Sequence, residues 1–269
     1  MPTQLTAQNV VDRIRGRLGA TWRNSAIDVF GAGRPETAVT GIVTSFAPSY
    51  KTLRRAAAAN CNMIVAREHV FYSHGRAPAQ LPEKRKEDPV IAAKLELIER
   101  HNLVVWRLAE NWDGQEGNPQ ARALAKTLGW EQHRIRDEFY TVRADSLENL
   151  AAGIGARLRA RGIRVIGSPQ TKIAKVALCP GMMLVPQLSK LLQEPDLDAV
   201  IIGEPVEWEA APYFQDVVAS GRKKGMIILG QAVSEEPGCG AMAAWLKTIV
   251  PEVAVEWIPA GEPFEGRRS

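Results

Sequence analysis

The sequence predicts an α/β protein whose strands pair mainly in parallel. Short apolar runs alternate with helical patterns along the whole chain. Several of the apolar runs are continuous, which favours strands that are buried in a sheet. The chain has 269 residues, 45% of them hydrophobic. That is enough material for one large domain or two smaller ones, with helices flanking the strands.

The first part of the chain contains four expected helices and three expected strands. We expect helices at residues 8–18, 49–60, 88–102 and 119–128, and strands at residues 38–46, 63–66 and 103–108. Ser49 is a candidate cap for the second helix. Asp88 at the cap and Pro89 at the first helical position mark the start of the third. The polar stretch 73–88 before that helix is expected to be a surface loop.

The second part continues the same alternation. We expect strands at residues 138–143, 163–167, 172–179, 199–203 and 225–230, and helices at residues 146–162, 183–193, 207–220 and 239–248. The stretch 252–259 closes the chain. The type of strand changes near residues 128–137. We therefore expect a first α/β domain at 1–130 and a second at 131–269.

The charge balance argues against a dedicated nucleic-acid surface. The chain carries 34 basic and 30 acidic residues, for a net charge of +4. This excess is small for the length, so attraction to polyanions is expected to be weak. The basic residues Lys51, Arg54 and Arg55 and the run at 157–164 are interpreted as solvated helix faces.

Cysteine content and hydropathy favour a cytoplasmic protein. The three cysteines contain no CxxC pair, so a disulfide framework is not expected. Cys179 ends an apolar run and is interpreted as a structural thiol. The first residues lack the apolar core of a signal peptide, and no apolar stretch approaches the length of a membrane span.

Polar side chains follow the expected buried strands. Arg67, Glu68 and His69 follow residues 63–66, with His74 further along, and Asp113 follows residues 103–108. In the second part, Glu204 follows residues 199–203, and residues 225–230 are followed by Gln231, Glu235 and Glu236. In open α/β sheets, ligands bind beyond the carboxyl ends of the strands. If the strands are parallel neighbours, these side chains could converge.

Carboxylates that converge repel each other unless a cation, a guanidinium or a proton separates them. Oxygen ligands with an imidazole suit Zn, Mn, Fe or Mg, and such a metal can activate a bound water for hydrolysis. The competing interpretation is that polar residues follow strands in any case. Helix N-termini also favour Asp and Glu because of the helix dipole.

The chain resembles the Nif-three-like dinuclear metal centre family. The resemblance rests on five segments in order: "VTGIVTSFAPSYKTLRRAAAANCNMIVAREHVFY", "HNLVVWRLAENWD", "VALCPGM", "DAVIIGEPVEWEA" and "MIILGQAVSEE". It implies two linked α/β domains with mixed, mostly parallel sheets, a hexameric ring and a pair of divalent metals in a cleft. Members of the family carry the name GTP cyclohydrolase type 2.

The metal ligands of the family carry over unevenly. Asp113 matches the family aspartate and Glu235 the glutamate of the last element, whereas Gln231 stands where the family has histidine. In one register Arg67 and Glu68 occupy the two histidine positions of the first turn. In the other register Glu68 and His69 occupy them. An arginine in this position could neutralise the carboxylates in place of the metal.

Three functions are therefore open. The first is a metal-dependent hydrolase of a small polar or nucleotide-like substrate, with Zn, Mn or Fe held by Glu68, His69, Asp113, Gln231 and Glu235. Glu204 or Glu236 would then be the general base. The second is a metal-free, non-catalytic ligand-binding or scaffold ring. The third, nucleic-acid binding, is disfavoured by the small net charge.

Overall fold

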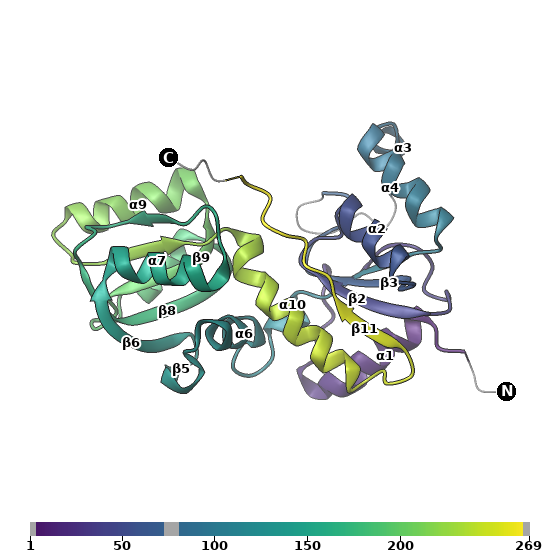
Figure 1. The fold of residues 1–269 in the computed structure, drawn as a ribbon, viewed down its shortest axis with the longest axis horizontal. Coiled ribbons are helices and arrows are strands. Elements are labelled where there is room, and N and C mark those ends of the chain that lie inside the picture. The colour runs from purple at the N-terminus through teal and green to yellow at the C-terminus, as the bar shows by residue number, and fades with distance from the viewer. Residues whose placement is uncertain (1–3, 73–80, 266–269) are drawn as a thin grey trace. The chain divides into compact units, whose positions relative to one another are not determined.

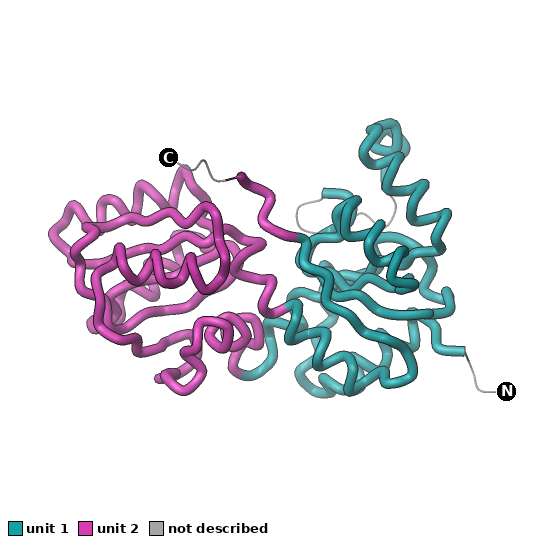
Figure 2. Tube along the Cα trace, viewed as in Figure 1, with its two compact units in different colours: residues 1–116, 239–260 teal, residues 117–238, 261–269 magenta. Residues whose placement is uncertain are grey.

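The computed structural model describes residues 4–72 and 81–265 (Figure 1). The chain forms two compact units, each built around its own sheet. Unit 1 comprises residues 1–116 and 239–260, and unit 2 comprises residues 117–238 and 261–269 (Figure 2). The expected division into 1–130 and 131–269 cuts the chain once, whereas the compact units divide it after residues 116, 238 and 260.

The sheet of unit 1 is mostly parallel. Its strand order is β1-β4-β3-β2-β11. The strands are β1 (Phe30–Ala32), β4 (Val104–Arg107), β3 (Met63–Ala66), β2 (Gly41–Ser45) and β11 (Ala254–Trp257). Only the edge strand β1 is antiparallel to its neighbour, β4. The carboxyl ends of β2, β3, β4 and β11 therefore lie at one edge of the sheet.

Helices cover both faces of this sheet (Figure 1). The helices of unit 1 are α1 (Ala7–Leu18), α2 (Tyr50–Ala58), α3 (Glu83–Lys86), α4 (Pro89–Arg100) and α5 (Glu110–Asp113), with a 3-10 turn at Gly19–Thr21. The short helix α3 has no buried residue and does not cover the sheet. Apolar side chains of α1 and of the second half of α10 (Gln231–Lys247) pack on one face. Those of α2 and α4 pack on the other. Strands that are buried on both faces explain the continuous apolar runs of β2 and β3.

The sheet of unit 2 is mixed, with the order β5-β6-β8-β9-β10-β7. The strands are β5 (Arg134–Arg136), β6 (Phe139–Ser146), β8 (Lys172–Met183), β9 (Ala199–Pro205), β10 (Gly225–Ile228) and β7 (Arg164–Ile166). The central strands β8, β9 and β10 are parallel. The outer pairings are antiparallel. The expected α/β class with mixed sheets is confirmed.

The helices of unit 2 again form two layers. They are α6 (Pro119–Leu128), α7 (Leu147–Leu158), α8 (Val185–Leu191), α9 (Glu207–Ala219) and the first residues of α10, with a 3-10 turn at Glu131–His133. Helices α6 and α7 pack on one face of the sheet, and α8 and α9 pack on the other. Across the described residues, no helix is long and apolar enough to cross a membrane.

The capping residues that the sequence indicated occupy their expected places. The carboxylate of Asp88 accepts hydrogen bonds from the amides of Val90 at 2.8 Å and Ile91 at 3.1 Å. The hydroxyl of Ser49 accepts one from the amide of Thr52 at 3.1 Å. These bonds satisfy amides that have no partner inside the helix, which explains why α2 and α4 begin where they do.

Several elements differ from the expectation. Strands β1 and β5 and helix α5 were not expected, and β8 continues to Met183. Helix α10 begins at Gln231 rather than at residue 239 and continues through Pro237. The glycines and the proline of "PGCG" hid the helical pattern, because both residue types usually interrupt helices. The stretch expected as a loop contains the short helix α3 at Glu83–Lys86, while residues 73–80 lie outside the described part.

Candidate functional site

The turn of residues 67–72 follows β3 and carries three of the predicted site residues. The amides of Arg67 and Glu68 donate to the carbonyl oxygen of Phe46 at 3.2 and 3.0 Å, which fixes the start of the turn beside β2. Lys94 of α4 donates to the carbonyl oxygen of Val70 at 2.5 Å. The turn is therefore anchored at both of its ends.

Arg67 lies in this turn with only 5% of its surface exposed. Its Nη2 is 2.7 Å from Oδ2 of Asp113, and its Nη1 donates to the carbonyl oxygen of Ala109 at 3.1 Å. A guanidinium keeps its charge at every pH at which the protein is folded. The carboxylate predicted to bind a metal is therefore neutralised by an arginine of the same unit.

Asp28 positions the helix that carries Asp113. Its carboxylate accepts hydrogen bonds from three consecutive amides at the start of α5: those of Ala109 at 2.7 Å, Glu110 at 3.1 Å and Asn111 at 2.8 Å. Asp28 is 8% exposed. Sequence analysis did not identify it, because it precedes β1 and stands far from α5 in the chain.

Arg107 is a second residue that sequence analysis missed. It is the last residue of β4 and lies beside Ala66 in the parallel register of the sheet. Its Nη1 is 2.8 Å from Nε2 of His69, and its Nη2 is 3.9 Å from Oε2 of Glu68. The sequence placed Arg107 at the end of an expected strand. Only the pairing of β3 with β4 shows that this places it beside the turn.

The residues of this turn do not fit the divalent metal that the family resemblance implies. Asp113 contacts Arg67, while Glu68 and His69 both face Arg107. At an effective dielectric constant of 20, a divalent ion about 4 Å from a guanidinium would be repelled by roughly 8 kcal/mol. Across residues 4–72 and 81–265, no three or more His, Cys, Asp or Glu side chains gather into a group that could hold a metal ion.

In unit 2 the structure brings Glu204 and Glu235 close together. Glu204 lies near the end of β9, and its pKa is raised by burial and by the negative charge of Glu235. Glu235 lies in α10 and is 4% exposed. Its Oε1 would be 2.8 Å from a Cβ atom at Gly181, which has a φ of 86°. Position 181 therefore favours glycine because of its positive φ, and a larger residue there would also displace the carboxylate of Glu235.

The other predicted residues of unit 2 are placed differently. Oε1 of Glu236 accepts a hydrogen bond from the amide of Gly261 at 3.4 Å. The carbonyl oxygen of Gln231 accepts one from the hydroxyl of Ser234 at 2.8 Å. Glu236 thus contacts the C-terminal segment. The hydrogen bond to Gln231 is made by its backbone within the first turn of α10. His74 lies outside the described residues.

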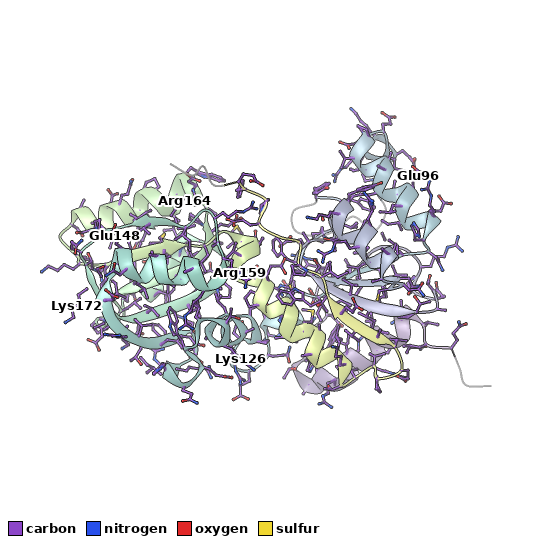
Figure 3. All side chains as sticks on the ribbon, in the orientation of Figure 1. Glu96, Lys126, Glu148, Arg159, Arg164 and Lys172 are labelled. Carbon is purple, nitrogen blue, oxygen red and sulfur yellow. The ribbon has the colours of Figure 1, made fainter. Side chains whose placement is uncertain are left out.

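Cys179 and the basic run at 157–164 both belong to unit 2, and α7 ends at Leu158, so most of the run lies beyond the helix on which it was expected. Burial raises the pKa of the Cys179 thiol, so it remains protonated and is a poor nucleophile. Arg159 and Arg164 are exposed on unit 2 (Figure 3). Arg164 pairs with Glu207 at 3.1 Å, and Arg161 pairs with Glu265 at 3.0 Å. These carboxylates reduce the positive potential of the run.

Comparisons with known proteins agree with the fold. The sequence model of the family described as Duf34/NIF3 (NGG1p interacting factor 3) matches residues 8–260. No curated protein matches the sequence.

Three similar solved structures cover nearly the whole chain. A Bacillus cereus protein related to NIF3 is 11% identical with a TM-score of 0.75, over 97% of this chain and 99% of that one. The Staphylococcus aureus hypothetical protein SA1388 is 14% identical with a TM-score of 0.72, over 98% and 100%. The protein ybgI, of unknown function, is 20% identical with a TM-score of 0.70, over 97% and 100%. At these identities the likeness shows the fold alone.

Proposed function

Because this chain belongs to the Duf34/NIF3 family but places arginines against its candidate ligands Glu68, His69 and Asp113, we propose that it binds a small polar ligand without a metal. The observation that carries the proposal is the contact between Arg67 Nη2 and Asp113 Oδ2 at 2.7 Å. The guanidinium provides the positive charge that a divalent ion would otherwise supply beside this carboxylate.

The burial of Arg67 supports a permanent role for this ion pair. A buried charge is costly unless it is paired and hydrogen-bonded. Arg67 meets that need with Asp113 and the carbonyl oxygen of Ala109. Removal of one partner from a buried pair typically costs about 3 to 5 kcal/mol, and the partly exposed position of Asp113 places this pair at or below the lower end. Asp113→Ala is therefore expected to lower stability, whereas loss of a metal ligand would chiefly remove a metal.

One observation favours the competing function, a metal-dependent hydrolase. The pKa of Glu204 is raised by burial and by the charge of Glu235, and a carboxyl group perturbed in this way is a candidate for proton transfer. Glu235 is the negative neighbour that contributes to the shift. In this alternative Glu204 would be the general base of unit 2, and Glu68, His69 and Asp113 of unit 1 would have to bind the metal against the charges of the two arginines.

Metal analysis distinguishes the two functions. The protein is purified without chelator, and its Zn, Mn and Fe content is measured by mass spectrometry of the elements. Binding of each ion is then titrated by calorimetry in the wild-type protein, in Asp113→Ala and in Arg67→His. We expect little metal in the wild-type protein and binding that gains strength in Arg67→His, because that change removes a fixed charge and adds an imidazole.

GTP, chosen because of the name that family members carry, serves as the probe for hydrolysis. The wild-type protein is expected to leave GTP unchanged with each of the three ions. A stoichiometric metal in the wild-type protein that is lost in Asp113→Ala, or metal-dependent turnover of GTP with the same dependence on Asp113, would refute the metal-free proposal and favour the hydrolase.

A further inference from the structure

The guanidinium of Arg107 contacts three consecutive residues of the turn. Its Nε donates to the carbonyl oxygen of Arg67 at 2.6 Å, its Nη1 lies 2.8 Å from Nε2 of His69, and its Nη2 lies 3.9 Å from Oε2 of Glu68. The side chain of Arg107 is 14% exposed. One side chain of β4 thus holds the whole segment that the family resemblance assigns to metal binding.

In the hydrogen bond between Arg107 and His69, only Arg107 can be the donor. A guanidinium has five N–H donors and no acceptor, so Nε2 of the imidazole must accept the hydrogen bond. A protonated imidazolium carries hydrogen on both ring nitrogens and cannot accept. The contact therefore requires a neutral ring whose proton is on Nδ1.

This hydrogen bond uses the lone pair that a metal would need. A histidine binds a metal through an unprotonated ring nitrogen, and in the Nδ1–H form that nitrogen is Nε2. His69 is 9% exposed, so the ring is enclosed in the position where Arg107 reaches it. The second guanidinium contact, to the carbonyl oxygen of Arg67, fixes the backbone two residues before the ring.

We propose that Arg107 is a positioning residue that holds His69 as the neutral Nδ1–H tautomer and so keeps metal ions from the imidazole. The inference rests on the proposed metal-free function for its meaning. The hydrogen bond itself is measurable whether or not that function is correct.

The planar fork of arginine is essential to this role. Contacts from Nε and Nη1 reach Arg67 and His69 at the same time. A lysine offers a single nitrogen and cannot reproduce two separated donors in one plane. Arg107→Lys should therefore keep the positive charge but hold His69 less firmly in one tautomer. Arg107→Met should remove both the charge and the hydrogen bond to His69.

Nitrogen-15 NMR of the imidazole rings tests the proposal directly. The chain has four histidines, so two-bond proton–nitrogen spectra of the full-length protein contain few signals. His69 is assigned by its absence in His69→Gln. In the wild-type protein at neutral pH, we expect its Nε2 to be unprotonated and its Nδ1 protonated in a single tautomer. In Arg107→Met, we expect the ring to exchange between both tautomers.

Controls separate this effect from unfolding. His101 and His133 are exposed, and their signals should be the same in the wild-type and variant proteins. Arg136→Met removes an arginine that contacts Glu194 and Phe139 in unit 2, and it should leave His69 unchanged. The wild-type spectrum needs no variant, so it tests the proposal even if Arg107→Met does not fold.

Zinc titration supplies the second readout. Zn²⁺ is expected to shift the His69 signals of Arg107→Met at a concentration at least about tenfold lower than in the wild-type protein. The substitution frees the lone pair on Nε2 and removes a positive charge that repels the ion. A wild-type His69 with its proton on Nε2, an unchanged single tautomer in Arg107→Met, or equal zinc sensitivity would overturn the inference. Metal found at Asp113 in the purified protein would instead overturn the proposed function and leave the tautomer result intact.

Discussion

Replacement of Lys94 by methionine is expected to stabilise the protein and to flatten its pH dependence. Lys94 is 1% exposed in α4. Its ammonium donates to the carbonyl oxygen of Val70 at 2.5 Å and lies 4.3 Å from the centre of the Tyr72 ring. Burial lowers the pKa of Lys94 from 10.5 to about 8. The charged form is therefore less stable in the folded protein than in the unfolded chain.

The pKa difference sets the size of the effect. At about 1.36 kcal/mol per tenfold change, a pKa lowered from 10.5 to about 8 corresponds to a cost on the order of 3 kcal/mol for the charged folded form. Below pH 8 both states carry the proton. As the pH rises above 8, the folded protein loses the proton first, so the free energy of unfolding increases until about pH 10.5. Between about pH 7 and about pH 9.5, this contribution amounts to about 2 kcal/mol.

Urea unfolding at these two pH values measures the contribution. Lys94→Met keeps much of the side-chain volume and removes the charge. We expect it to exceed the wild-type stability at pH 7 by about 2 kcal/mol, after about 1 kcal/mol is lost because the Val70 carbonyl loses its donor. Lys51→Met, at an exposed position of α2, is the control.

The comparison between the wild-type protein and Lys94→Met cancels the titration of all other groups. The increase in unfolding free energy from pH 7 to pH 9.5 should be about 2 kcal/mol smaller in the variant than in the wild-type protein. Lys51→Met should keep the wild-type increase. An equal increase in the wild-type protein and in Lys94→Met would show that burial of Lys94 does not carry this cost.

Two further predictions concern unit 2. The Tyr140 hydroxyl is buried and has no hydrogen-bond partner among the described residues. Tyr140→Phe is therefore expected to raise the free energy of unfolding, measured by urea titration, by about 1 kcal/mol. A loss of stability would show that the hydroxyl has a partner. A Cβ atom at Gly203 would lie 2.5 Å from both the carbonyl oxygen of Gly181 and the hydroxyl of Ser234, so Gly203→Ala should lower the melting temperature and cost about 3 kcal/mol. Gly153→Ala, which meets no atom within 4 Å in α7, is the matched control and should raise stability by about 0.5 to 1 kcal/mol; equal effects of the two substitutions would contradict the packing argument.

Local sequence patterns were sufficient wherever the physical signal is local. A capping side chain acts on amides two or three residues away, so Ser49 and Asp88 could be identified without knowledge of the fold. Apolar continuity likewise marked β2 and β3, because both faces of the sheet of unit 1 are covered by helices. The α/β class follows from these same patterns.

The site was predictable only in part. The positions of Arg67 and Asp113 after two expected strands indicated that they could meet if the strands were neighbours, and one of the alternatives was that the arginine neutralises the carboxylates. The sequence could not show which acceptors bind the guanidinium of Arg67. They depend on the position of α5, which Asp28 fixes from another part of the chain. Glu204 and Glu235 were likewise identified as carboxylates that follow strands. Their mutual repulsion arises only because α10 lies near the end of β9 in the folded protein.

The sequence by itself determined the family, the class of fold, and most helices and strands, and it left two registers open for the candidate metal ligands of the first turn. The tertiary structure decided that α10 begins in unit 2 and ends in unit 1, and that Arg107 contacts His69. The reason is physical: periodicity and capping act within a few residues, whereas Arg107 and His69 meet only because β3 and β4 pair in a register that places Ala66 beside Arg107. This register determines which side chains contact the turn.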